Sequence, residues 1–116
     1  MSDLTIYHNP RCSKSRQTLE LIRGSGVEPN IVLYLEDTPS VSDLKDALDK
    51  LELNPVEILR KGEVEYKEHV AGKSGYSDDD LINLMVRFPR MIERPIVISK
   101  DKAIIGRPPE NVLQII

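Results

Sequence analysis

The chain has little of several things, and each scarcity excludes a class of protein. Its 116 residues include one cysteine, so no disulfide can form within the chain. Its longest apolar runs, such as residues 95–98, fall far short of the roughly 20 residues that a membrane-spanning helix needs. The net charge is −3, with acidic and basic residues interspersed, so the basic surplus of a nucleic-acid-binding protein is missing.

The start of the chain also lacks the basic segment and apolar stretch of a secretory signal. Together with the single cysteine, this indicates the reducing cytoplasm. The length suits one domain spanning residues 1–116, and 40% hydrophobic with 30% charged residues is typical of a globular protein. We expect a monomer with no nucleic-acid or membrane partner.

The order of predicted elements is typical of a thioredoxin-like (glutaredoxin-like) α/β fold with a mixed four-stranded sheet. Residues 4–7 predict a buried strand, and residues 13–23 a helix that ends at glycines. Residues 31–35 are nearly all apolar, which predicts a parallel strand covered on both faces. Residues 95–98 and 103–105 predict a hairpin, and residues 108–116 a final helix that begins with proline.

A helical insertion is predicted at about residues 39–90, before the hairpin. Apolar residues spaced three, four and three apart indicate one helix in residues 41–51. Ser77 and the three aspartates after it are typical of the start of another helix, which Pro89 ends. Residues 62–75 are polar and contain glycines, so we predict an irregular segment there.

The single cysteine, Cys12, has unusual surroundings. A lone cysteine is most often a small buried hydrophobic residue. This one follows a strand and a proline-containing turn, where we expect the chain at the surface, and it begins a helix whose free N–H groups favour an anion. His8 lies close enough to donate to the sulfur, and three basic residues adjoin it: Arg11, Lys14 and Arg16. We therefore interpret Cys12 as a reactive thiolate.

A thiolate at this position is energetically feasible without a metal. The pKa of a free cysteine is near 8.5, so roughly 2–3 kcal/mol of stabilisation is needed at neutral pH. A helix N-terminus supplies roughly 0.3–1 kcal/mol of this, and neighbouring cations and a serine hydroxyl can supply the remainder.

The residues after Cys12 exclude some thiol chemistries. The spacing is that of a redox C-x-x-C motif with Ser15 in place of the second cysteine, so the resolving thiol must come from glutathione or another protein. Thr18 stands where a phosphatase-type loop would need an arginine, six positions after the cysteine. His8, Cys12 and His69 match no structural zinc spacing, so we expect no metal site.

Pro95 directly precedes a predicted strand, where thioredoxin-like folds keep a cis proline that faces the reactive cysteine. We therefore predict a cis Arg94–Pro95 peptide bond, although a proline that merely opens a strand remains the alternative. Arg94 and Arg107 bracket the last two strands. Each, like Arg60, could otherwise be solvated surface charge, or, for Arg60, the partner of a nearby glutamate.

Three segments are distinctive as a set: Tyr-His-Asn-Pro-Arg-Cys-Ser-Lys-Ser-Arg at 7–16, Glu-Arg-Pro-Ile-Val at 93–97 and Gly-Arg-Pro at 106–108. With them the chain resembles a short-form member of the ArsC family, the arsenate reductases coupled to glutathione and glutaredoxin. The resemblance covers nearly the whole chain. It implies an oxidoreductase that acts in cytoplasmic arsenic detoxification, binds no cofactor and uses glutathione as a co-substrate.

The resemblance also implies roles for individual residues. Cys12 would attack arsenate, glutathione would displace an oxygen from the adduct, and glutaredoxin would complete the reduction to arsenite. His8 matches the histidine thought to lower the thiol pKa, and Ser15 the hydroxyl next to the sulfur. The planar guanidinium group suits a tetrahedral oxyanion better than an ammonium does. The family's three anion-binding arginines fall on Arg60, Arg94 and Arg107.

Two other functions remain open from the sequence. One is a general monothiol reductase that acts on glutathione mixed disulfides. The other is a regulator that resembles Spx and binds RNA polymerase. Those regulators typically use a C-x-x-C switch and need no set of oxyanion-binding arginines, whereas here Ser15 replaces the second cysteine and the three arginines are present.

Overall fold

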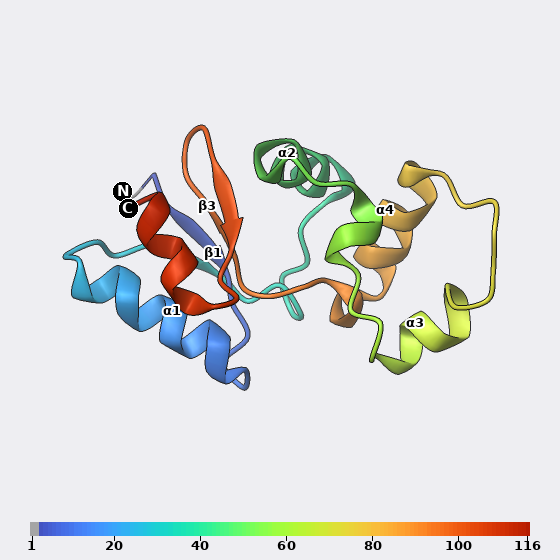
Figure 1. Cartoon of the computed structure of the whole chain (residues 1–116), viewed down its shortest axis with the longest axis horizontal. Coiled ribbons are helices and arrows are strands. Elements are labelled where there is room, and N and C mark those ends of the chain that lie inside the picture. The colour runs from blue at the N-terminus through green and yellow to red at the C-terminus, as the bar shows by residue number, and fades with distance from the viewer. Residues whose placement is uncertain (1–2) are drawn as a thin grey trace. The chain divides into compact units, whose positions relative to one another are not determined.

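The computed structural model describes residues 3–116, which form two compact units (Figure 1). The first, which we call the sheet unit, comprises the described residues up to Asp37 together with Arg94–Ile116. The second, the helical unit, is Thr38–Glu93 and spans the range in which the sequence predicts an insertion. That the whole chain forms a single domain stays a prediction.

The sheet unit contains a mixed four-stranded sheet in the order β2-β1-β3-β4. Its strands are β1 (Thr5–Tyr7), β2 (Asn30–Val32), β3 (Ile96–Ile98) and β4 (Ala103–Ile105). β1 and β2 are parallel, while β3 is antiparallel to both β1 and β4. Helix α1 (Ser13–Gly24) connects β1 to β2, and the 3-10 helix η3 (Pro109–Gln114) follows β4. This is the thioredoxin-like α/β fold that the sequence predicts.

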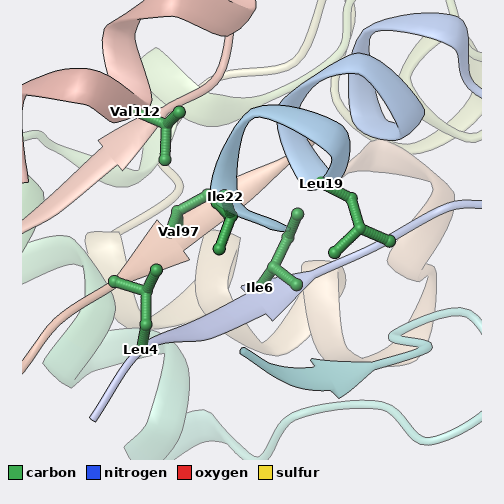
Figure 2. Close-up of a cluster of buried hydrophobic side chains, with 6 residues drawn as sticks. All are labelled: Leu4, Ile6, Leu19, Ile22, Val97 and Val112. Atoms are coloured by element: carbon green, nitrogen blue, oxygen red, sulfur yellow. The ribbon is translucent and has the colours of Figure 1, made fainter. Parts of the chain in front are cut away.

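The core of the sheet unit lies between the sheet and its two helices, α1 and η3, which run side by side (Figure 1). Ile22 of α1 packs with Ile6 of β1, Val97 of β3 and Val112 of η3, and all four side chains are fully buried (Figure 2). Burying a side chain of this size contributes roughly 1.5–3 kcal/mol. The packing holds α1 against the sheet, so the start of α1 lies just beyond the carboxyl end of β1.

Two predicted elements of the sheet unit differ from the structure. The apolar run 31–35 predicts a strand covered on both faces, but β2 is the edge strand of the sheet and Ile31 is 39% exposed. The parallel pairing of β2 with β1 is confirmed. The final element is a 3-10 helix rather than an α-helix over 108–116, although proline does occupy its first turn.

Gly106, which follows β4, marks a close approach between two parts of the sheet unit. A Cβ atom at this position would lie 2.5 Å from Oγ1 of Thr18 on α1 and 2.8 Å from Cγ of Pro95. Any larger residue would therefore push the chain after β4 away from α1. Arg107 directly follows this glycine, so the contact bears on where its side chain lies.

The helical unit consists of three α-helices and two 3-10 helices. They are α2 (Val41–Leu51), η1 (Pro55–Ile58), α3 (Val64–His69), α4 (Asp78–Arg87) and η2 (Pro89–Met91). The predicted helices at 41–51 and after Ser77 are confirmed, and Ser77 forms a capping box with Asp80. The irregular segment predicted at 62–75 is wrong in part, because α3 lies within it.

Two segments of the helical unit lie side by side in antiparallel fashion. Leu59 and Ile92 form an isolated bridge, and the N–H of Glu93 donates to the carbonyl oxygen of Ile58 at 2.8 Å. The N–H of Arg60 donates to the carbonyl oxygen of Met91 at 2.7 Å. Arg60 is thus held beside the segment that leads into Arg94. Among the residues described, no helix combines the length and apolarity needed to cross a membrane.

Candidate active site

Cys12 is the N-cap residue of α1, as the sequence predicts. Its N–H donates to the carbonyl oxygen of Asn9, and its own carbonyl oxygen accepts from the N–H of Arg16, both at 3.0 Å. The neighbours Arg11 and Ser13 are exposed, but Cys12 itself is only 8% exposed. The chain therefore runs at the surface here, as expected, but the Cys12 side chain itself is buried.

The sulfur of Cys12 is surrounded by groups that favour the thiolate. Burial raises the pKa of the Cys12 thiol, but hydrogen bonds from the backbone N–H of Ser15 and from the Arg94 side chain lower it, as does the charge of Arg94. The backbone N–H of Lys14 adds a smaller lowering effect. The net result is a pKa below the ordinary value for cysteine. The first turn of α1 and an arginine outside it act together on the sulfur.

Arg107 approaches the same sulfur. Its Nη2 lies 3.6 Å from Sγ of Cys12, and its Nε donates to the carbonyl oxygen of Arg94 at 2.8 Å. One edge of the guanidinium is thus bound to the backbone while another nitrogen faces the thiol. The Arg94–Pro95 peptide bond, for which the sequence predicts cis, is cis, and so is Arg107–Pro108, which was not foreseen.

His8 and Ser15 form a buried pair next to the cysteine. His8 Nδ1 and Ser15 Oγ are 2.6 Å apart, and the same Oγ accepts from the N–H of Asn9 at 3.1 Å. Burial lowers the pKa of His8, and the charges of Arg23 and Arg16 lower it further, so the imidazole is neutral at neutral pH. The sequence suggests that His8 donates to the sulfur, but its Nδ1 contacts Ser15 instead.

The basic residues nearest to Cys12 in sequence do not surround its sulfur. Arg16 Nη1 donates to the carbonyl oxygen of Pro10 at 3.0 Å, and Arg11, Lys14 and Arg16 are all exposed. The cations that act on the thiol are supplied by Arg94 and Arg107 from the β3–β4 side of the sheet unit. The prediction that the adjoining residues stabilise the thiolate by their charge was wrong, because their side chains are exposed to solvent and the charge that lowers the pKa of Cys12 belongs to Arg94.

Arg60 is held by carboxylates within the helical unit. Its Nη1 donates to Glu93 Oε1 at 2.7 Å, and its Nε lies 3.6 Å from Glu63 Oε2. Glu63 also pairs with Arg90, at 3.5 Å. The salt bridge considered from the sequence is therefore present, and the binding of a substrate anion by Arg60 remains a prediction. Glu93 directly precedes Arg94 in the chain.

One functional candidate, Thr18, was not identified as a site residue from the sequence. Thr18 is fully buried, and its Oγ1 donates to the carbonyl oxygen of Lys14 at 2.8 Å and, at the longer distance of 3.4 Å, to that of Gly106. The glycine in Gly-Arg-Pro was the only available signal, since it marks a close approach of the backbone. Within residues 3–116, no group of three His, Cys, Asp or Glu residues could hold a metal ion.

This arrangement can stabilise a thiolate and bring an anion to it. Two guanidinium groups and two backbone N–H groups converge near Cys12, while the neutral His8 adds no charge. A thiolate nucleophile and an anionic substrate repel each other, and cations placed beside both remove that barrier. The site therefore suits nucleophilic attack by sulfur on an oxyanion or on a disulfide that carries negative charge.

Comparison with known proteins agrees with this chemistry. The ArsC family matches residues 7–115. The uncharacterized protein YfgD of Escherichia coli K12 is 51% identical over 112 residues, which are 96% of this chain and 94% of that protein. An arsenate reductase of Escherichia coli is 42% identical over 116 residues, which are 100% of this chain and 82% of that protein.

Solved structures show the same relationship. An arsenate reductase from Vibrio cholerae superposes with a TM-score of 0.92 at 48% identity, and the match covers 97% of both chains. The family match includes the three segments around Cys12, Arg94 and Arg107. The protein is thus homologous to arsenate reductases, which are oxidoreductases, and it belongs to the ArsC family.

Proposed function

We propose that the protein is an arsenate reductase that reduces arsenate to arsenite through the thiolate of Cys12, with glutathione and glutaredoxin as external reductants. The observation that carries the proposal is that Arg107 Nη2 lies 3.6 Å from Cys12 Sγ. Arg94 also acts on this thiol and lowers its pKa. Arsenate is an anion, and planar guanidinium groups bind tetrahedral oxyanions well. Relatives at 42% and 48% identity are arsenate reductases.

The reaction balances with two external thiols. The Cys12 thiolate forms a bond to arsenic while one oxygen leaves as water after protonation. Glutathione then displaces a second oxygen in the same way, and a thiol of glutaredoxin attacks the glutathione sulfur. The electron pair of the bond between the glutathione sulfur and arsenic passes to arsenic, which falls from the +5 to the +3 state. Glutathione and glutaredoxin are left joined as a mixed disulfide. Hydrolysis of the remaining bond to Cys12 releases arsenite and restores the thiol.

His8 and Ser15 support the nucleophile in this proposal. Ser15 donates its N–H to the sulfur, while its Oγ holds both the N–H of Asn9 and Nδ1 of His8. These contacts fix the turn before Cys12 against the first turn of α1. The neutral imidazole therefore acts on the thiol through Ser15, by keeping the backbone N–H of Ser15 aimed at the sulfur.

Arg60 is the third arginine of the proposed oxyanion site. Its inclusion rests on the family resemblance, in which one of the three anion-binding arginines falls on Arg60. Alanine at position 60 should raise the KM for arsenate about tenfold, the usual effect of losing one charge-assisted bond. Alanine at Arg90, which shares Glu63 with Arg60 but is 62% exposed, is the matched control and should leave KM unchanged. Equal effects of the two variants would remove Arg60 from the site.

The proposed partners follow from the single thiol. Ser15 replaces a second cysteine, so both reducing thiols must come from outside the chain, and glutathione with glutaredoxin supplies them. We place the protein in the cytoplasm, where these reductants are abundant, and propose that it acts as a monomer in arsenic detoxification with no bound cofactor.

A general glutathione-dependent monothiol reductase is the second candidate. The position of Cys12 at a helix start, with a thiol pKa below the ordinary value, favours it, because a reactive thiolate alone suffices for exchange with a glutathione mixed disulfide. The Spx-like regulator has less support, since it would leave the two arginines beside Cys12 without a purpose.

One coupled assay separates these functions. Oxidation of NADPH through glutathione reductase, glutathione and glutaredoxin is followed with arsenate, and separately with a glutathionylated peptide, as the substrate. The proposal predicts oxidation that requires both this protein and arsenate, with arsenite as the product. Turnover of the mixed disulfide alone would make the monothiol reductase the correct function, and activity with neither substrate would favour the regulator.

A further inference from the structure

We propose that Thr18 is a positioning residue for Arg107: its buried hydroxyl joins the first turn of α1, which holds the sulfur of Cys12, to the residue that carries Arg107. Only the expected effect of Thr18 on arsenate kinetics rests on the proposed function. The contacts that carry it concern the thiol and its cation.

The hydroxyl of Thr18 lies between the two parts of the site. Its Oγ1 is 2.8 Å from the carbonyl oxygen of Lys14 and 3.4 Å from that of Gly106, and it has one hydrogen to share between them. Lys14 and Ser15 donate the backbone N–H groups that lower the pKa of Cys12. One side chain without any exposed surface therefore contacts the turn that binds the sulfur and the strand end that supplies the cation.

The contact at Gly106 leaves little room for adjustment. A Cβ atom there would be 2.5 Å from Thr18 Oγ1, so the backbone of Gly106 already lies directly against that side chain. Arg107 is the next residue, and its guanidinium is held by the carbonyl oxygen of Arg94 and reaches 3.6 Å from Sγ. A displacement of Gly106 from α1 therefore moves the origin of the Arg107 side chain.

The residue type at position 18 also bears on which element supplies the guanidinium near the sulfur. A phosphatase-type loop would place an arginine here, six residues after the cysteine, whereas this chain has threonine. The guanidinium near the sulfur belongs instead to Arg107, the neighbour of the glycine that Thr18 contacts. Threonine at position 18 brings no charge to the sulfur, but through Gly106 it positions Arg107, which does.

The test compares two alkylating agents that differ in charge. The rate of Cys12 modification by iodoacetate, divided by that by iodoacetamide, senses a cation beside the sulfur, and the fraction of thiolate cancels from this ratio. Thr18→Val removes the hydroxyl at nearly constant volume and should lower the ratio about threefold, as Arg107→Ala should. Thr18→Ser keeps the hydroxyl and should restore the wild-type ratio. Thr5→Val on β1 is the control for loss of a threonine hydroxyl elsewhere in the sheet unit.

A double-mutant cycle decides whether Thr18 acts through Arg107. If it does, Thr18→Val has no further effect on the ratio in an Arg107→Ala background. An unchanged ratio in Thr18→Val, or the same decrease in both backgrounds, would overturn the proposal. If the valine variant fails to fold, Thr18→Ala and Thr18→Ser differ only in the hydroxyl and give the same comparison.

Arsenate kinetics separate this inference from the proposed function. We expect Thr18→Val to raise the KM for arsenate more than it lowers kcat, because the displaced group binds the anion. Wild-type protein that does not reduce arsenate but shows coupling in the cycle would contradict the proposed function alone. Arsenate reduction with an additive cycle would contradict the role of Thr18 alone.

Discussion

Arg107 Nη2 lies 3.6 Å from Cys12 Sγ, although the two residues are 95 positions apart in the chain. The same guanidinium donates through Nε to the carbonyl oxygen of Arg94, so its orientation depends on the backbone at the start of β3. The positive charge at the thiol is therefore a product of tertiary structure, and exposed basic residues beside Cys12 in sequence contribute little to it.

Replacing Arg94 or Arg107 by alanine should lower kcat/KM for arsenate at least about tenfold. Each variant loses a charge-assisted bond to the anion, roughly 1.5–3 kcal/mol, and 1.4 kcal/mol is a factor of ten. Cys12 alkylation by the neutral iodoacetamide should stay fast, since the backbone N–H groups of α1 remain. Arg11→Ala is the control, because this exposed arginine adjoins the cysteine in sequence only. Unchanged arsenate kinetics in both site variants would eliminate the oxyanion site.

The alkylation of Cys12 should show a midpoint below the pKa of a free cysteine, near 8.5. Because the pKa is depressed in the folded state, the thiolate stabilises the fold fully above the unfolded pKa, and this contribution is lost as the pH falls through the folded pKa. The difference in unfolding free energy between wild type and Cys12→Ser should thus increase with pH. Alkylation rates with iodoacetamide against pH give the midpoint, and a value at or above that of free cysteine would refute the prediction.

Ser15→Ala should destabilise the sheet unit by roughly 1–3 kcal/mol, because it removes the partner of His8 Nδ1 and of the Asn9 N–H. Ser13→Ala on the exposed side of the same turn is the control and should change stability little.

The wild type should also lose stability as the pH falls below the ordinary histidine pKa. The unfolded chain then takes up a proton that buried His8 resists. Urea unfolding at several pH values measures both effects, and equal stability of the two serine variants would contradict the first.

Gly106→Ala should destabilise the protein by roughly 1–3 kcal/mol, since its Cβ would lie 2.5 Å from Thr18 Oγ1 and 2.8 Å from Pro95 Cγ. Gly24→Ala at the end of α1 meets no atom within 4 Å and should be neutral or slightly stabilising. Thermal unfolding of the two variants gives the comparison. If Gly106→Ala melts at the wild-type temperature, the close approach at this residue is not rigid.

The order of elements and the position of Cys12 at the start of α1 could be predicted, because local patterns decide both. The exposure of β2 could not, since an apolar run does not reveal whether its strand lies at the edge of a sheet. The short helix α3 was missed because its segment is polar and lies between glycines. Strand order and isolated short helices depend on contacts that one sequence does not display.

Only those site residues that lie in the motifs shared with a known family could be predicted from the sequence. Arg94 and Arg107 came from resemblance, whereas proximity in sequence pointed to Arg11, Lys14 and Arg16, whose side chains are exposed. The link from Thr18 to Gly106 spans 88 positions and has no sequence signature beyond the glycine itself. Such contacts become visible only in the folded chain, where β4 pairs with β3 and Gly106, which follows β4, lies against Thr18 of α1.

The most direct test of the central claim is arsenite formation in a single turnover. Purified wild type and Cys12→Ser are mixed with arsenate, glutathione and glutaredoxin, and the arsenite produced is measured by separation of the two arsenic species. With the protein in excess over arsenate, the account predicts that the wild type converts the added arsenate to an equal amount of arsenite, and that the serine variant gives none above background. Equal arsenite from both proteins, or none from the wild type while its thiol stays reactive, would contradict the account.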